Sequence, residues 1–115
     1  MLVLGSGTGI GRATARAFLE QGACVAVLGR RAEPLHETVA GFDTKHVQVI
    51  EADVTDADAL DGAVGVVRLF DRLDVIVDDA GTSEPSGVDT LNDTWERLRS
   101  VNLDGVIRLA RPTVP

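Results

Sequence analysis

The sequence predicts an α/β domain in which parallel strands alternate with helices. Short apolar segments recur along its 115 residues, as expected of strands that are buried on both faces of a sheet. Each is followed, after a few residues, by a segment with apolar side chains at helical spacing. A glycine-rich turn joins the first strand to the first helix. Together these observations predict right-handed crossovers and a parallel sheet.

Composition indicates one soluble globular domain over residues 1–115. The chain is 44% hydrophobic and 25% charged, and its net charge of −7 argues against nucleic acid or an anionic membrane as a partner. No apolar run approaches the ~20 residues of a membrane span. The single Cys24 cannot form an internal disulfide, so we expect a reducing, cytoplasmic environment. No spacing typical of metal ligands occurs, and no metal is expected.

The first half of the chain contains two strand–helix units. A strand is expected at Met1–Leu4, and the helix after the glycine turn ends at Gly22. The second strand is expected at Cys24–Leu28. Its helix should run from about residue 33 to residue 39, with Pro34 tolerated in the first turn.

The second half adds two more units. Strands are expected at Val47–Ile50 and Asp74–Val77, and Thr55 can cap the helix between them. A polar loop over residues 82–89 precedes a last helix that begins near Leu91. The residues expected on one stripe of that helix are Leu91, Trp95, Leu98, Asn102, Gly105 and Leu109.

The turn from Gly5 to Gly11 predicts a phosphate-binding site. Its glycines allow positive φ and close approach of a ligand, while the N–H groups at the helix start point at an anion. The spacing is neither G-x-G-x-x-G nor a P-loop, because no lysine follows. Gly5, Gly9 and Gly11 instead fit G-x-x-x-G-x-G, with Ile10 between the last two. A flexible turn without a ligand is the alternative.

This pattern resembles that of the short-chain dehydrogenase/reductase family, although Leu4 stands where the family usually has Thr. The resemblance implies a Rossmann-type doubly wound parallel sheet. Here the sheet would be incomplete, with about four βα units and strand order 3-2-1-4. The cofactor-binding residues implied in this loop are Gly5, Ser6, Gly7, Thr8, Gly9, Ile10 and Gly11.

The residues after the second strand favour NADP over NAD. In dinucleotide sites a carboxylate at this position binds the ribose 2′-hydroxyl and selects NAD. This chain has Gly29 there, followed by Arg30 and Arg31. A guanidinium can bind a 2′-phosphate in bidentate fashion, each bond contributing about 1.5–3 kcal/mol. Two solvated arginines in a turn are the alternative.

Further segments resemble other parts of the family's cofactor site. Asp53 and Val54, after the third strand, resemble the family's segment that contacts adenine; a helix cap is the alternative role for Asp53. Another segment stands where the family typically has Asn-Asn-Ala-Gly, but Asp78 and Asp79 replace the amides with carboxylates. We therefore expect weaker cofactor binding than in a typical member, or a raised pKa at one of the pair. The cofactor-binding residues implied here are Asp53, Val54, Asp78, Ala80 and Gly81.

Asn102 resembles the helix Asn of the family's catalytic Asn-Ser-Tyr-Lys tetrad, where it holds a water in a proton relay. A core Asn bonded to a backbone carbonyl is the alternative. The tetrad's Ser, Tyr and Lys follow this helix in the family, and this sequence has no tyrosine and only one lysine, Lys45. The resemblance implies hydride transfer between NADP(H) and a small-molecule carbonyl or alcohol. The 115 residues alone are expected to be inactive.

Two other possibilities stay open: a non-catalytic NADP-binding module and an inactive remnant.

The fourth strand would present an apolar edge, and the last helix an uncovered face. Such surfaces promote pairing with other chains, so we expect a homo-oligomer or poor solubility.

Overall fold

A four-stranded parallel sheet with the order β3-β2-β1-β4 forms the centre of the computed structural model. The structure describes residues 1–84, 87 and 92–113. The strands are β1 (Leu2–Leu4), β2 (Val25–Gly29), β3 (Val47–Glu51) and β4 (Ile76–Asp78). The predicted Rossmann-type sheet and its strand order are confirmed. In register, Leu4 pairs with Leu28 and Asp78, so the carboxyl ends of the three strands lie together.

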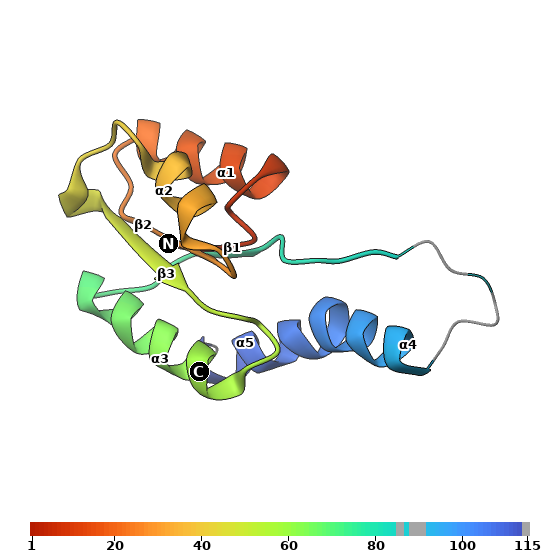
Figure 1. Ribbon diagram of the computed structural model, residues 1–115. Coiled ribbons are helices and arrows are strands. Elements are labelled where there is room, and N and C mark those ends of the chain that lie inside the picture. The colour runs from red at the N-terminus through yellow and green to blue at the C-terminus, as the bar shows by residue number, and fades with distance from the viewer. Residues whose placement is uncertain (85–86, 88–91, 114–115) are drawn as a thin grey trace.

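Helices cover both faces of the sheet, as Figure 1 shows. Successive side chains of β1 point to opposite faces of the sheet. Leu2 and Leu4 pack in one cluster with α3 and Leu109, whereas Val3 packs in the other with α1 and α2. The helices are α1 (Gly9–Glu20), α2 (Ala32–Val39), α3 (Ala57–Val67), α4 (Asn92–Arg99) and α5 (Gly105–Thr113), with short 3-10 turns at Thr44–His46 and Arg68–Phe70.

Strand boundaries differ from the predicted ones by one or two residues. The largest difference is at β4, which begins at Ile76 rather than at the predicted Asp74. Asp74 instead forms an ion pair with Arg72, 2.6 Å away. The carbonyl of Val75 still accepts a hydrogen bond from the amide of Leu2 at 2.9 Å.

The predicted cap of α3 is wrong by one residue. Asp56, not Thr55, has the extended backbone that precedes the helix, and its carboxylate accepts from the amide of Ala59 at 3.1 Å. Thr55 instead donates its hydroxyl and its amide to Asp53. Both residue types are good caps, so the choice depends on where the chain turns into the helix.

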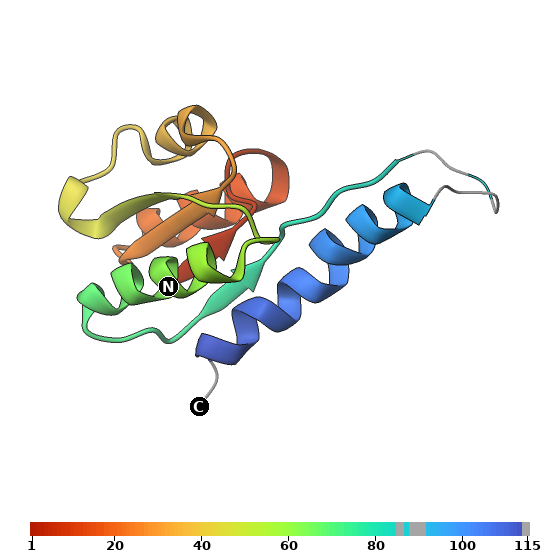
Figure 2. The same ribbon diagram turned by 60° about the horizontal axis from the view of Figure 1, so that its bottom comes forward.

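The last helix differs most from its prediction. A π-helical segment, Ser100–Asp104, interrupts it, and α4 and α5 flank this segment as one rod that extends beyond the sheet (Figure 2). The wider turn shifts the phase of the helix, so the predicted stripe does not stay on one face. Of the residues predicted on the stripe, Leu109 is buried, whereas Trp95 is 59% exposed. Leu91 and part of the predicted polar loop lie outside the described residues.

No helix within the described ranges is long and apolar enough to cross a lipid bilayer.

Candidate functional site

A cleft of about 480 Å³ lies at the carboxyl edge of the sheet. This volume falls in the range of small-molecule sites. Segments from β1, β2, β3 and β4 converge there, as expected where strand order reverses in an open α/β sheet. The lining residues are Gly5, Gly7, Thr8, Gly9, Ile10, Leu28, Gly29, Arg30, Arg31, Pro34, Leu35, Ala52, Asp53, Val54, Asp79, Ala80, Gly81, Thr82 and Val101.

The loop between β1 and α1 requires glycine for two reasons. Gly5 and Gly9 have φ of +67° and +57°, which L side chains rarely adopt. A Cβ at Gly5 would also lie 2.5 Å from the carbonyl oxygen of Asp79, and one at Gly11 would collide with the carbonyl of Gly5. The glycines therefore let α1, β1 and the end of β4 approach one another closely.

The start of α1 is open toward the cleft. Its N-cap residue, Thr8, makes no side-chain capping hydrogen bond. Thr8, Gly9 and Ile10 all line the cleft. Backbone amides at a helix start form a site for anions, because they combine free N–H groups with the positive end of the helix dipole.

The structure does not place Ser6 and Gly11 in the lining, although both were predicted to contact the cofactor. Ser6 is fully buried, and its hydroxyl donates to the carbonyl of Val3 at 2.9 Å. The same hydroxyl accepts from the amide of Leu28 at 3.1 Å. Ser6 therefore joins β1 to β2 beneath the loop.

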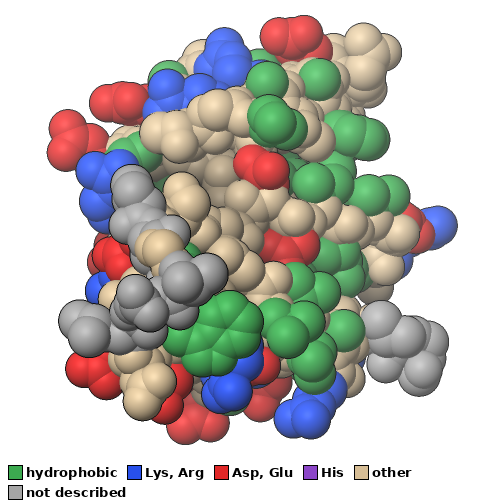
Figure 3. Space-filling view, turned by 90° about the vertical axis from the view of Figure 1, so that its right-hand side faces the viewer, with side chains coloured by type: hydrophobic (Ala, Val, Ile, Leu, Met, Phe, Trp, Pro, Cys, Tyr) green, Lys and Arg blue, Asp and Glu red, His purple; other side chains and the backbone are tan. Residues whose placement is uncertain are grey.

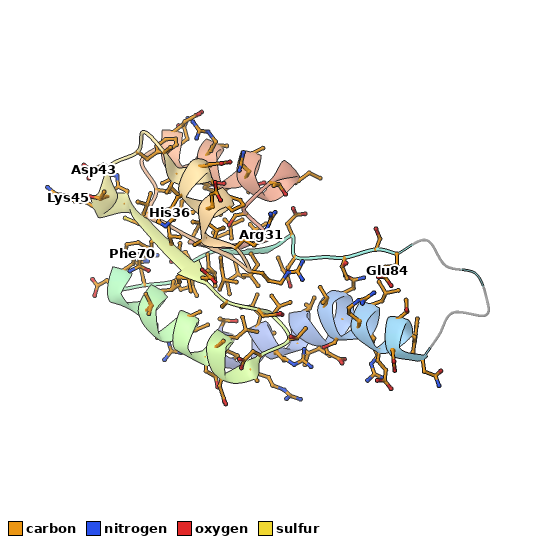
Figure 4. All side chains as sticks on the ribbon, in the orientation of Figure 1. Arg31, His36, Asp43, Lys45, Phe70 and Glu84 are labelled. Atoms are coloured by element: carbon orange, nitrogen blue, oxygen red, sulfur yellow. The ribbon has the colours of Figure 1, made fainter. Side chains whose placement is uncertain are left out.

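Arg30 and Arg31 follow β2 directly and both line the cleft, as predicted from their position; Figure 4 labels Arg31. The positive charge of Arg30 acts on Asp53, which follows β3 and also lines the cleft. The hydrogen bond from the backbone amide of Thr55 lowers the pKa of Asp53, and the charge of Arg30 lowers it further. Val54 lines the cleft as well.

Asp78, the last residue of β4, and Asp79, which follows it, lie in different environments. Asp79 lines the cleft, and its carboxylate accepts from the amide of Gly11 at 2.9 Å, in the first turn of α1. Asp78 does not line the cleft, and its carboxylate accepts from the amide of Ala80 at 3.1 Å. Partial desolvation raises the pKa of Asp78, and the charge of Asp79 adds to the rise. A raised pKa at one of the pair was expected.

Asn102 lies in the π-helical segment, beside the cleft rather than in its lining. Its amide donates to the carbonyl of Thr82, and its oxygen accepts from the amide of Thr82, both at 2.8 Å. The side chain is exposed. The expectation that it lies on a buried stripe is therefore wrong, because in the π-helical segment Asn102 faces the backbone of Thr82, in the irregular segment that follows β4.

Several lining residues were not predicted as site residues: Leu28, Gly29, Pro34, Leu35, Ala52, Asp79, Thr82 and Val101. Most of them end a strand or follow one closely. Position at the carboxyl end of a parallel strand is a signal that could have identified these residues. Pro34, Leu35 and Val101 come from helices, and only helix packing brings them to the cleft.

Comparison with known proteins identifies the family. Residues 1–115 match the family described as short chain dehydrogenase. This chain belongs to the short-chain dehydrogenase family. Among curated relatives, an uncharacterized oxidoreductase of Staphylococcus epidermidis is 31% identical over 99% of this chain and 50% of its own length. Secoisolariciresinol dehydrogenase of Forsythia intermedia is 35% identical over 91% of this chain and 39% of its own length.

Solved structures of short-chain dehydrogenases and reductases share the fold. A 3-ketoacyl-ACP reductase from Sinorhizobium meliloti superposes with a TM-score of 0.91 at 34% identity, covering 99% of this chain and 47% of that protein. L-Sorbose reductase from Gluconobacter frateurii, complexed with NADPH and L-sorbose, gives 0.89 at 29% identity, covering 99% and 45%. This chain thus spans about half the length of the relatives that it matches.

Proposed function

We propose that this chain binds NADP(H) and forms the cofactor-binding half of an oxidoreductase. The complete protein would transfer hydride between the nicotinamide and a small-molecule carbonyl or alcohol. The observation that carries the proposal is the convergence of the glycine loop, Arg30 and Arg31 on one cleft. The loop fits a pyrophosphate, since a Cβ at Gly9 would meet nothing within 4 Å and the side chain of Thr8 makes no capping hydrogen bond to α1.

Each segment of the cleft has a proposed role. The loop amides would bind the pyrophosphate, and the two arginines would bind the 2′-phosphate. Asp53 and Val54 would contact the adenine, with the carboxylate accepting from its amine. Ala80 and Gly81, in the segment after β4, would contact the ribose and nicotinamide part of the cofactor. When bound, the nicotinamide would supply or accept hydride.

A preference for NADP over NAD has two supports. The end of β2 carries Gly29 rather than a carboxylate, so nothing there would repel a 2′-phosphate. In addition, the structurally similar L-sorbose reductase was solved with NADPH.

Catalysis by these 115 residues alone is not expected. Protonation of the forming alkoxide needs an acid such as tyrosine, and the sequence has none. Its one lysine, Lys45, precedes β3 at the edge of the sheet opposite the cleft (Figure 4). We propose that Asn102 would serve the family's proton relay, held in place by Thr82, once Ser, Tyr and Lys partners are present. An inactive remnant is the second candidate, favoured by the carboxylates of Asp78 and Asp79, which stand where the family typically has amides.

Replacing Arg30 and Arg31 together with alanine should weaken NADPH binding by about tenfold to a hundredfold, because the charge-assisted bonds to the 2′-phosphate are lost. NADH binding should change little. Fluorescence titration of the wild-type chain and the variant with both cofactors measures the two ratios. Replacing Arg72 and Arg111 together with alanine, two exposed arginines that do not line the cleft, is the control for net charge. Equal loss of NADH and NADPH affinity would refute the assignment of a 2′-phosphate site.

We also propose that the chain is cytoplasmic and that it self-associates. Figure 3 shows hydrophobic side chains gathered on the face from which α4 projects. Trp95, Leu103, Val106 and Ile107 are between 45% and 59% exposed on α4, the π-helical segment and α5. Burial of such side chains contributes about 25 cal/mol per Å² of apolar surface. Light scattering should therefore show a dimer or larger species, and Trp95→Glu should shift it toward monomer. A monomer across the micromolar range would contradict this.

A further inference from the structure

Two carbonyl groups of the glycine loop accept hydrogen bonds from side chains of α1 and α2. The hydroxyl of Thr38 donates to the carbonyl of Ser6 at 2.7 Å, and it also lies 3.0 Å from the carbonyl of Pro34. Nη2 of Arg12 donates to the carbonyl of Gly7 at 2.5 Å. Nε of Arg12 donates to the hydroxyl oxygen of Thr38 at 3.1 Å, which joins both contacts into one network.

This network is buried where it meets the loop. Thr38 and Ser6 are both fully inaccessible to solvent. Removing one partner of a buried hydrogen bond leaves the other unsatisfied, which costs more than the bond itself contributes. Arg12 is anchored at its outer side by Glu37, 3.2 Å away, and by the carbonyl of Pro34 at 3.2 Å. The guanidinium is thus fixed in one orientation.

Fixing these carbonyls also fixes the direction of two amides. The C=O of one residue and the N–H of the next belong to one planar unit, and in a trans peptide they point in opposite directions. No cis peptide occurs in the described part of the chain. When the carbonyl of Ser6 points at Thr38, the amide of Gly7 points away from it. The carbonyl of Gly7 directs the amide of Thr8 in the same manner, away from Arg12.

We propose that Arg12 and Thr38 are positioning residues that hold the loop amides in place for the cofactor's pyrophosphate. The inference rests on the proposed function, because it assigns how the same cleft binds its phosphates. Gly7 and Thr8, whose amides the network orients, both line the cleft, whereas Arg12 and Thr38 do not. The two side chains therefore act on the cofactor only through the loop.

Arg16 offers a matched comparison. It lies one turn further along α1 and also contacts α2, since its guanidinium donates to the carbonyl of Thr38 at 2.9 Å and lies over the ring of Phe42. Within the described part of the chain, Arg16 makes no hydrogen bond to the glycine loop. Replacing either arginine with lysine keeps the positive charge but loses the planar fork of donors. Any difference between the two variants thus reports on the loop rather than on attraction between charges.

The test compares NADPH with adenosine 2′-phosphate, a ligand that lacks the pyrophosphate. Arg12→Lys and Thr38→Val should each weaken NADPH binding about tenfold and leave adenosine 2′-phosphate binding unchanged. Thr38→Ser, which keeps the hydroxyl that Thr38→Val removes, should bind NADPH as the wild type does. Arg16→Lys should bind both ligands as the wild type does. Thermal midpoints of Arg12→Lys and Arg16→Lys should be similar, so that a loss of NADPH affinity is not a loss of fold.

A second readout needs no ligand. Hydrogen exchange of the amides of residues 6–9, measured without cofactor, should be faster in Arg12→Lys than in Arg16→Lys. Equal exchange and equal NADPH affinity in these two variants would overturn the proposal, and so would parallel weakening of both ligands. If the wild-type chain binds no NADPH, the proposed function fails, while the exchange rates still decide whether Arg12 orders the loop.

Discussion

Gly11→Ala should destabilise the chain by about 3 kcal/mol and abolish measurable NADPH binding, because the new methyl group would collide with the carbonyl of Gly5. The obstacle is backbone, which cannot rotate away as a side chain can. Relief of the collision would move α1 away from β1 and open the loop between them. Chemical denaturation measures the loss of stability, and NADPH titration under native conditions measures the loss of binding.

Gly62→Ala is the control for this substitution. Gly62 also lies inside a helix, α3, but a Cβ there would meet nothing within 4 Å. Alanine favours helix over glycine by up to about 1 kcal/mol, so this variant should be slightly more stable than the wild type. If both variants are equally stable, the close approach of α1 to Gly5 is not a constraint on the fold.

Asp79→Asn should strengthen NADPH binding about tenfold. The carboxylate of Asp79 lies in the cleft at the start of α1, where the structure joins it to the amide of Gly11 at 2.9 Å. A cofactor pyrophosphate bound there would face this negative charge, and repulsion of about 1–4 kcal/mol is expected for charges about 4 Å apart near a protein surface. The amide oxygen of asparagine can still accept from Gly11, so the substitution removes charge and keeps the contact.

The control and the salt dependence separate local repulsion from net charge. Asp61→Asn makes the same change in net charge at an exposed position on α3. It should leave NADPH affinity unchanged. The advantage of Asp79→Asn should also shrink as ionic strength rises from 0.01 M to 1 M, since the Debye length falls from about 30 Å to 3 Å. An equal gain in both variants would mean that residue 79 has no special place in the site.

Much of this protein follows from local sequence patterns. Continuous apolar segments predicted four parallel strands, and the resemblance to the short-chain dehydrogenase/reductase family implied the strand order that the structure has. The G-x-x-x-G-x-G spacing predicted where the cleft would be, and position after the second strand predicted that Arg30 and Arg31 would line it. These features are local, because periodic burial, positive φ at glycine and the end of a strand each depend on a few neighbouring residues.

The tertiary structure decided the contacts between distant segments. Asp79 meets Gly11 across 68 residues, and Thr38 meets Ser6 across 32, because strand register and helix packing bring their segments together. Likewise, the π-helical segment, and not the spacing of apolar residues, determined that Asn102 bonds to Thr82 at the surface. Sequence patterns report which face of an element is buried and where the chain turns. Which side chain then forms a hydrogen bond with a given backbone N–H or C=O group depends on the packing of the whole sheet and its helices.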